Sequence, residues 1–160
     1  MSRNKYLASQ RGFVLLELVG LIALILLSGG LVYLQGEALW QQYYKQQVRF
    51  MGQLLAGDLR QLQYQALFKI DNVTRDVRTN ANRDGYYLTE KGLATKTQLF
   101  STYNCADVYF ESRITKLEFS KNGAPYVNGY YRLRHKRLAN FVYQIDVQPI
   151  TGRVLAYDAQ

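Results

Sequence analysis

An apolar run near the N-terminus, Phe13–Leu34, constrains this chain of 160 residues more than any other feature. It holds about 22 residues with Glu17 as the one charge, and a helix of that length spans ~33 Å, enough for a ~30 Å hydrocarbon core. Arg3, Lys5 and Arg11 precede it without an acid, which predicts that this end stays in the cytoplasm. A carboxylate at bilayer depth costs on the order of 3 kcal/mol, so Glu17 needs a partner.

The apolar run has three interpretations. A plain membrane anchor leaves Glu17 without a purpose. A secretory signal is cut on the far side of its apolar core, at small residues. Ser28-Gly29-Gly30 offers such a site, but the apolar run continues past it to Leu34. In the third interpretation the chain is cut before the run, between Gly12 and Phe13, which frees a cationic amine on Phe13. That amine can pair with Glu17, most usefully with that of a neighbouring chain, so that two costly charges cancel on assembly.

The segment Gly12–Glu17 resembles the class III signal of type IV pilins and pseudopilins. That resemblance implies that a prepilin peptidase cuts after Gly12 and methylates the new amino terminus at Phe13. Glu17 then becomes the fifth mature residue. Val14 departs from the pattern, since the family more often has threonine there. Loss of the leader, residues 1–12, removes three bases and lowers the formal charge from +8 to +5.

Helical periodicity continues beyond the apolar run. Apolar residues recur at steps of three and four on one face: Trp40, Tyr44, Val48, Met51, Leu55, Leu59, Leu62 and Ala66. No proline interrupts the chain between Phe13 and Phe68. We therefore predict one helix of about 55 residues. Residues 13–34 are its transmembrane half, and residues 35–68 are an amphipathic half that packs against the rest of the chain, with Asp58 off the apolar stripe.

Residues 69–160 are predicted to form a connector followed by an antiparallel sheet. The connector, Ile70–Thr97, is polar and is predicted to be looped, with a short strand at Tyr86–Thr89 after the turn signal Arg83-Asp84-Gly85. Strand signals then follow at Val108–Glu111, Ile114–Phe119, Gly129–His135, Phe141–Val147 and Arg153–Tyr157. Their short turns, such as Lys136–Ala139, favour a meander of three or four strands. The predicted class is α+β, with a long N-terminal helix packed on a C-terminal antiparallel sheet.

This layout is that of pilin heads. The segments Phe50–Leu59, Ile114–Gly123, Tyr143–Val147 and Gly152–Val154 resemble minor pseudopilins of Gram-positive competence pili, similar to H-type pseudopilins of type II secretion. The resemblance implies a structural pilus subunit for DNA uptake in transformation. The implied partners are prepilin peptidase, major and other minor pseudopilins, an assembly ATPase and a platform protein. The implied location is the cell membrane, single-pass with the N-terminus in the cytoplasm, and then the cell surface.

Two other functions stay open. One is a substrate-engaging subunit of a type II secretion-like pseudopilus, which binds DNA or a protein. The other is an unprocessed, membrane-anchored accessory protein. No enzyme, metal site or cofactor is predicted, since Cys105 and His135 are the single residues of their kinds and too few for the usual zinc or Cys–His sites. A Gly-x-Ser-x-Gly elbow is also missing from the sequence.

The basic run on the head is the candidate site for DNA contact: Arg132, Arg134, Lys136 and Arg137. Nearby aromatic rings could stack on bases: Tyr130, Tyr131 and Tyr143. The alternative is a solvated hairpin whose charges discourage edge-to-edge aggregation. Cys105 is predicted to be a buried small residue or a bystander, and an intermolecular disulfide within a fibre stays open.

Overall fold

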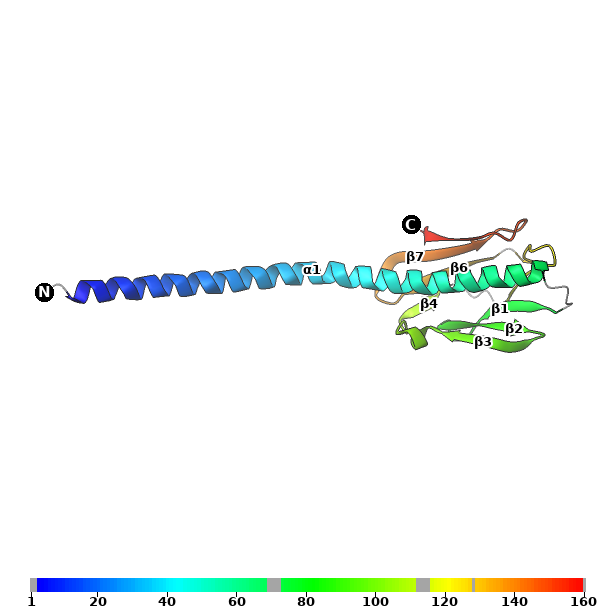
Figure 1. Ribbon diagram of the computed structural model, residues 1–160, viewed down its shortest axis with the longest axis horizontal. Coiled ribbons are helices and arrows are strands. Elements are labelled where there is room, and N and C mark those ends of the chain that lie inside the picture. Colours follow the sequence, from blue (N-terminus) through cyan, green and yellow to red (C-terminus); the bar gives the residue numbers. More distant parts are fainter. Residues whose placement is uncertain (1–2, 69–72, 112–115, 128, 160) are drawn as a thin grey trace. The chain divides into compact units, whose positions relative to one another are not determined.

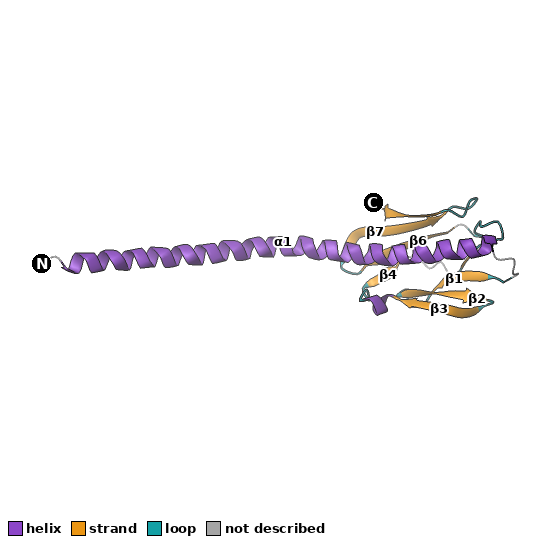
Figure 2. Cartoon of the chain, in the orientation of Figure 1, coloured by secondary structure: helices purple, strands orange, loops and turns teal. Residues whose placement is uncertain are grey.

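The computed structural model describes residues 3–68, 73–111, 116–127 and 129–159. The helix α1, Arg3–Phe68, opens the chain (Figures 1 and 2). It ends at Phe68 as predicted, but it begins at Arg3 rather than at Phe13. The chain forms two compact units, residues 1–41 and 42–160, and α1 contributes residues to both.

Eight strands follow α1, and they form two four-stranded antiparallel sheets. Their bounds are β1 (Arg75–Thr79), β2 (Gly85–Glu90), β3 (Leu93–Leu99), β4 (Val108–Phe110), β5 (Leu117–Glu118), β6 (Gly129–His135), β7 (Leu138–Val147) and β8 (Val154–Ala159). A short 3₁₀ helix, η1 (Phe100–Tyr103), follows β3. The first sheet has the order β3-β2-β1-β5 and the second β4-β6-β7-β8. In Figure 1 they lie on the two sides of the second half of α1.

The short strand predicted at Tyr86–Thr89 is confirmed as part of β2, but the prediction that the rest of the connector is looped was wrong, because the segment also forms β1 and most of β3. Its strands are polar but their charges are paired. Arg75 donates to Glu90 across the β1–β2 pair at 2.8 Å. Asp76, which is buried, accepts from Arg78 at 2.8 Å and lies 3.6 Å from Lys116. Ion pairs therefore replace the apolar alternation that would have indicated a strand.

The prediction of a meander is confirmed for β6, β7 and β8, which pair in sequence order. The prediction of a single sheet was wrong, since the chain forms two sheets and β5 pairs with β1 in the first of them. Of the predicted strand Ile114–Phe119, Ile114 and Thr115 lie outside the described residues, and Leu117–Glu118 form β5. The predicted turn Lys136–Ala139 is shorter than expected. Leu138 already pairs with His135, so only Lys136 and Arg137 form it.

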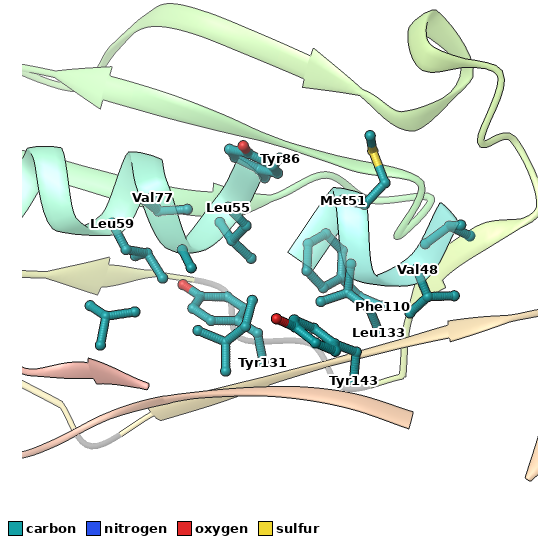
Figure 3. Packing of buried hydrophobic residues seen from close by; sticks show 14 of the residues in the cluster. Val48, Met51, Leu55, Leu59, Val77, Tyr86, Phe110, Tyr131, Leu133 and Tyr143 are labelled. Carbon is teal, nitrogen blue, oxygen red and sulfur yellow. The ribbon is translucent and has the colours of Figure 1, made fainter. Parts of the chain in front are cut away.

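The core lies between the second half of α1 and both sheets (Figure 3). The helix contributes the buried part of the predicted stripe: Val48, Met51, Leu55, Leu59 and Leu62. The sheets contribute Val77, Tyr86, Phe110, Tyr131, Leu133, Tyr143 and Ile145. Burial of each such side chain is worth ~1.5–3 kcal/mol. Trp40 was wrongly placed on this stripe, since it is 60% exposed and the core begins one to two turns later.

Candidate functional site

The first half of α1 presents apolar side chains that no part of its own unit covers. The exposed residues are Leu15, Leu16, Leu18, Val19, Leu21, Ile22, Leu24, Ile25, Leu26, Leu27, Leu31, Val32 and Tyr33. Among the described residues, α1 is the helix long and apolar enough to cross a membrane, with a mean hydropathy of 2.5 over its most apolar window. A helix that is apolar all round is stable only when lipid or other helices surround it.

Glu17 lies within this apolar segment and is exposed, like its neighbours Leu16 and Leu18. Gly12 and Phe13 lie within α1, and only their backbone belongs to the described part of the structure. Cleavage after Gly12 and methylation of Phe13 therefore stay predictions. The surface of this segment could serve helix packing or membrane insertion, and Glu17 is the polar group that either process must accommodate.

The structure brings the four predicted bases of the head together on one hairpin. Arg132 and Arg134 lie on the same face of β6, since residues two apart in a strand share a face, and both are half-buried. Lys136 and Arg137 form the β6–β7 turn, with side chains 62% and 65% exposed. A groove of about 480 Å³ lies beside the two strand arginines. It is lined by Arg132, Arg134, Ala139, Asn140, Val142 and Ala159.

Two acids partly neutralise the strand arginines and the turn. Glu111 lies 2.8 Å from Arg134 and 3.9 Å from Arg132. Asp107 lies 3.6 Å from Lys136 and 3.4 Å from Arg137. Four bases thus share two carboxylates, and the hairpin carries about half of the positive charge that its sequence indicates.

The predicted stacking platform does not form. Tyr131 and Tyr143 are buried in the core, because their positions alternate with the outward-facing residues of β6 and β7. Tyr130 is 46% exposed, and the guanidinium of Arg132 lies 4.9 Å from the centre of its ring. One exposed ring is left where several were expected.

His135 fixes the turn of this hairpin to α1. Its ring stacks on Tyr44 at 4.4 Å. Nδ1 accepts from the backbone N–H of Arg137 at 3.1 Å, and Nε2 lies 3.2 Å from the Oε1 of Gln47, so the neutral ring carries its proton on Nε2. Burial lowers the pKa of His135, and the two cations of the turn lower it further against the opposing charge of Asp107. The role of this residue is packing.

Asp58 was predicted to lie off the apolar face of α1, yet it is buried. Its carboxylate accepts from the hydroxyl of Tyr86 at 2.7 Å and from Lys96 at 2.9 Å. Burial, together with the carboxylate of Asp58, raises the pKa of Tyr86. A signal for this position was present, because Asp58 lies three residues after Leu55 and four before Leu62.

A polar pocket of about 260 Å³ adjoins this group. It is lined by Asp58, Gln61, Leu62, Gln65, Arg75, Leu88, Thr89, Glu90, Thr95 and Lys96. Among the described residues no three His, Cys, Asp or Glu side chains are arranged to hold a metal ion. Cys105 is buried as predicted, its thiol donates to the carbonyl of Tyr103 at 3.3 Å, and burial raises its pKa.

No protein-family model and no curated protein matches this sequence. Among solved structures, the chain is similar to the type IV minor pilin FimU of Pseudomonas aeruginosa, with a TM-score of 0.55 and 11% sequence identity. The match covers 69% of this chain and 87% of that one. The shared features are the long N-terminal helix and antiparallel sheets packed on its second half. The predicted class is therefore confirmed, and this chain has the type IV pilin fold.

Proposed function

We propose that this protein is a minor structural subunit of a type IV pilus-like fibre, assembled through its N-terminal helix. The observation that carries the proposal is the exposed apolar segment of α1, with Glu17 inside it, in a chain of type IV pilin fold. A subunit of this kind needs a helix that is stable first in lipid and then among other helices. Both environments are apolar, so the same surface serves both.

Processing supplies the partner for Glu17. The chain is inserted with residues 1–12 in the cytoplasm, and prepilin peptidase cuts between Gly12 and Phe13. The amine of Phe13, which stays cationic after methylation, then pairs with the Glu17 carboxylate of a neighbouring subunit. Each charge alone is costly in an apolar medium, and pairing removes most of that cost on assembly. Assembly therefore becomes more favourable than storage in the membrane.

The resemblance of the head to competence pseudopilins extends the proposal to a fibre for DNA uptake in transformation. Its partners would be major and other minor pseudopilins, an assembly ATPase and a platform protein. The subunit would be held in the cell membrane by one span and then displayed at the cell surface. Residues 69–160 would form the displayed head, and this division of the chain belongs to the proposal.

A second candidate function is direct engagement of DNA through Arg132, Arg134, Lys136 and Arg137. The exposed turn supports it, whereas the pairing of the four bases with Glu111 and Asp107 weakens it. The double variant Arg134→Glu with Arg137→Glu tests this function in a DNA-binding assay over a range of salt concentrations. Direct contact requires weaker binding and a shallower salt dependence. Unchanged binding and uptake would exclude it.

The third candidate is an unprocessed accessory protein, and the mass of the mature chain distinguishes it from a processed pilus subunit. Mass spectrometry of the full protein isolated from membranes should find a chain that begins at Phe13 and carries one added methyl group. A fully functional chain that keeps Met1–Gly12 would contradict the pilus subunit and favour the accessory protein. Gly12→Val should block the cut, because the peptidase site is proposed to require the glycine. The uncut form should then stay in the membrane.

A further inference from the structure

We propose that the head binds acidic phospholipid headgroups through a basic collar, defined as Lys45, Arg49, Lys136 and Arg137. This inference rests on the proposed membrane-anchored state of the subunit. It concerns the period before assembly, when the head lies next to the bilayer. The collar holds the head on the surface, which leaves its other faces available to partners.

Chain connectivity keeps the collar near the membrane. Lys45 follows the apolar run, which ends at Leu34, by about three helical turns, or ~16 Å of rise. The headgroup layer takes up several of these ångströms, and a charge is felt over ~8–10 Å at physiological ionic strength. Trp40, which is exposed, and Tyr43 lie between Leu34 and Lys45, and such aromatic residues favour the membrane–water interface. Lys45 therefore lies within reach of the surface field.

The contacts of the head bring the other members to the same place. Lys45 and Arg49 both lie over the ring of Phe141, at 5.7 and 5.6 Å from its centre. Arg137 donates to the hydroxyl of Tyr44 at 3.0 Å, and its guanidinium lies over the Tyr44 ring at 5.6 Å. Lys136 precedes Arg137 in the same turn. Lys45 and Arg49 thus lie on one short segment of α1, and the turn that carries Lys136 and Arg137 contacts this segment through Tyr44.

The charge of the collar stays positive after its ion pairs are counted. Arg49 pairs with Asp158, while Lys136 and Arg137 share Asp107. Among the described residues no acid forms a salt bridge with Lys45. The side chains at the turn are mostly exposed, so they can exchange Asp107 for a lipid phosphate without burial of a new charge. Acidic phospholipids offer such phosphates at high density, which favours them over a single carboxylate.

Amine labelling of the full chain tests the collar. The protein is reconstituted in vesicles of phosphatidylcholine, alone or mixed with phosphatidylglycerol, and a water-soluble acylating reagent modifies exposed lysines before mass spectrometry. Lys45 and Lys136 should react several-fold more slowly in the mixed vesicles, and high salt should remove the difference. Lys91 is the internal control. Lys91 is exposed in the β2–β3 turn and is not a member of the collar. The whole length of strand β3, ~23 Å, lies between this turn and η1 at the other end of the strand.

A variant separates binding by the collar from simple proximity. In Lys136→Glu, the protection of Lys45 in mixed vesicles should fall, whereas Lys91→Glu should leave it unchanged. Equal labelling of Lys45 in both kinds of vesicle would overturn the collar. So would protection by duplex DNA but not by phosphatidylglycerol, which would assign the collar to nucleic acid. A chain that alkaline carbonate strips from both vesicles would contradict the membrane anchor, and the collar proposal with it.

Discussion

Gly52 on α1 lies directly against the ring of Tyr143 on β7. An added Cβ at Gly52 would lie well inside van der Waals distance of ring atoms Cδ1 and Cε1. The ring is itself buried, so it has little room to move away. The absence of a side chain at Gly52 therefore lets the second sheet approach the helix closely.

Gly52→Ala should destabilise the protein by ~1–2 kcal/mol. Overpacking costs ~1–3 kcal/mol, and the better helix propensity of alanine offsets up to ~1 kcal/mol of it. Denaturant unfolding in detergent, followed by circular dichroism, measures the change.

Gly57→Ala is the matched control on the same helix. Gly57 is exposed, and an added Cβ there meets nothing within 4 Å. This variant should be more stable than the native chain by ~0.5–1 kcal/mol. If both substitutions shifted stability in the same direction, close packing on Tyr143 would not be the reason for Gly52.

The buried pair Asp58–Tyr86 should show a measurable coupling energy. Tyr86→Phe removes the 2.7 Å hydrogen bond but leaves Lys96 beside the carboxylate, and should cost ~1.5–3 kcal/mol, since the acceptor is charged. Asp58→Leu should cost at least as much, because the Tyr86 hydroxyl then loses its acceptor and Lys96 loses its counter-charge. A double-mutant cycle on the free energy of unfolding isolates the pair. Strict additivity of the two substitutions would show that the hydrogen bond contributes nothing.

The stability of the head should fall as the pH drops below about 6.5. Burial lowers the pKa of His135 in the folded state, so the unfolded chain takes up a proton first. The contribution of His135 to the free energy of unfolding is complete above the pKa of the unfolded state. It is lost progressively as the pH falls through the lower pKa of the folded state. Since His135 is the only histidine, His135→Gln should flatten the stability profile between pH 7 and pH 5.5. A profile that is equally steep in the variant would assign the loss to other groups.

The thiol of Cys105 should resist modification in the native protein. It is 2% exposed, and burial raises its pKa, so little thiolate is available at neutral pH. Labelling with a maleimide should become fast only in denaturant, and assembled material should give a monomer band on a non-reducing gel. A ladder of disulfide-linked species would show that Cys105 becomes exposed on assembly.

The helix and the second sheet were predictable from sequence because local periodicity encodes them. Steps of three and four marked Val48, Met51 and Leu55, and short turns marked β6 and β7. The faces of Tyr131 and Tyr143 were predicted wrongly, because both rings point into the core. The burial of Trp40 was predicted wrongly, because periodicity shows which face of a helix a residue lies on but not where along the helix the core begins. The burial of Asp58 was not predicted, because a charged residue on a helix was assumed to face the solvent.

The first sheet and the neutralised hairpin could not be predicted, since both depend on contacts between distant parts of the sequence. β1 is polar, and its burial becomes favourable only when Glu90 and Lys116 arrive from elsewhere. The pairing of Tyr109 with Arg134 brings Glu111 beside the arginines, and no local pattern encodes that register. The net charge of this basic run thus depends on acids that strands remote in sequence bring beside it.

The most direct test of the central claim is the distribution of a Glu17→Gln variant between the membrane and the sheared pilus fraction. The variant keeps the shape of the side chain and removes the charge that the Phe13 amine is proposed to meet. It should be cut after Gly12 normally, yet accumulate in the membrane with little in the pili. Glu37→Gln, an exposed acid beyond the apolar run, should assemble like the native chain. Equal amounts of the Glu17→Gln and native chains in the pilus fraction would contradict assembly by charge pairing.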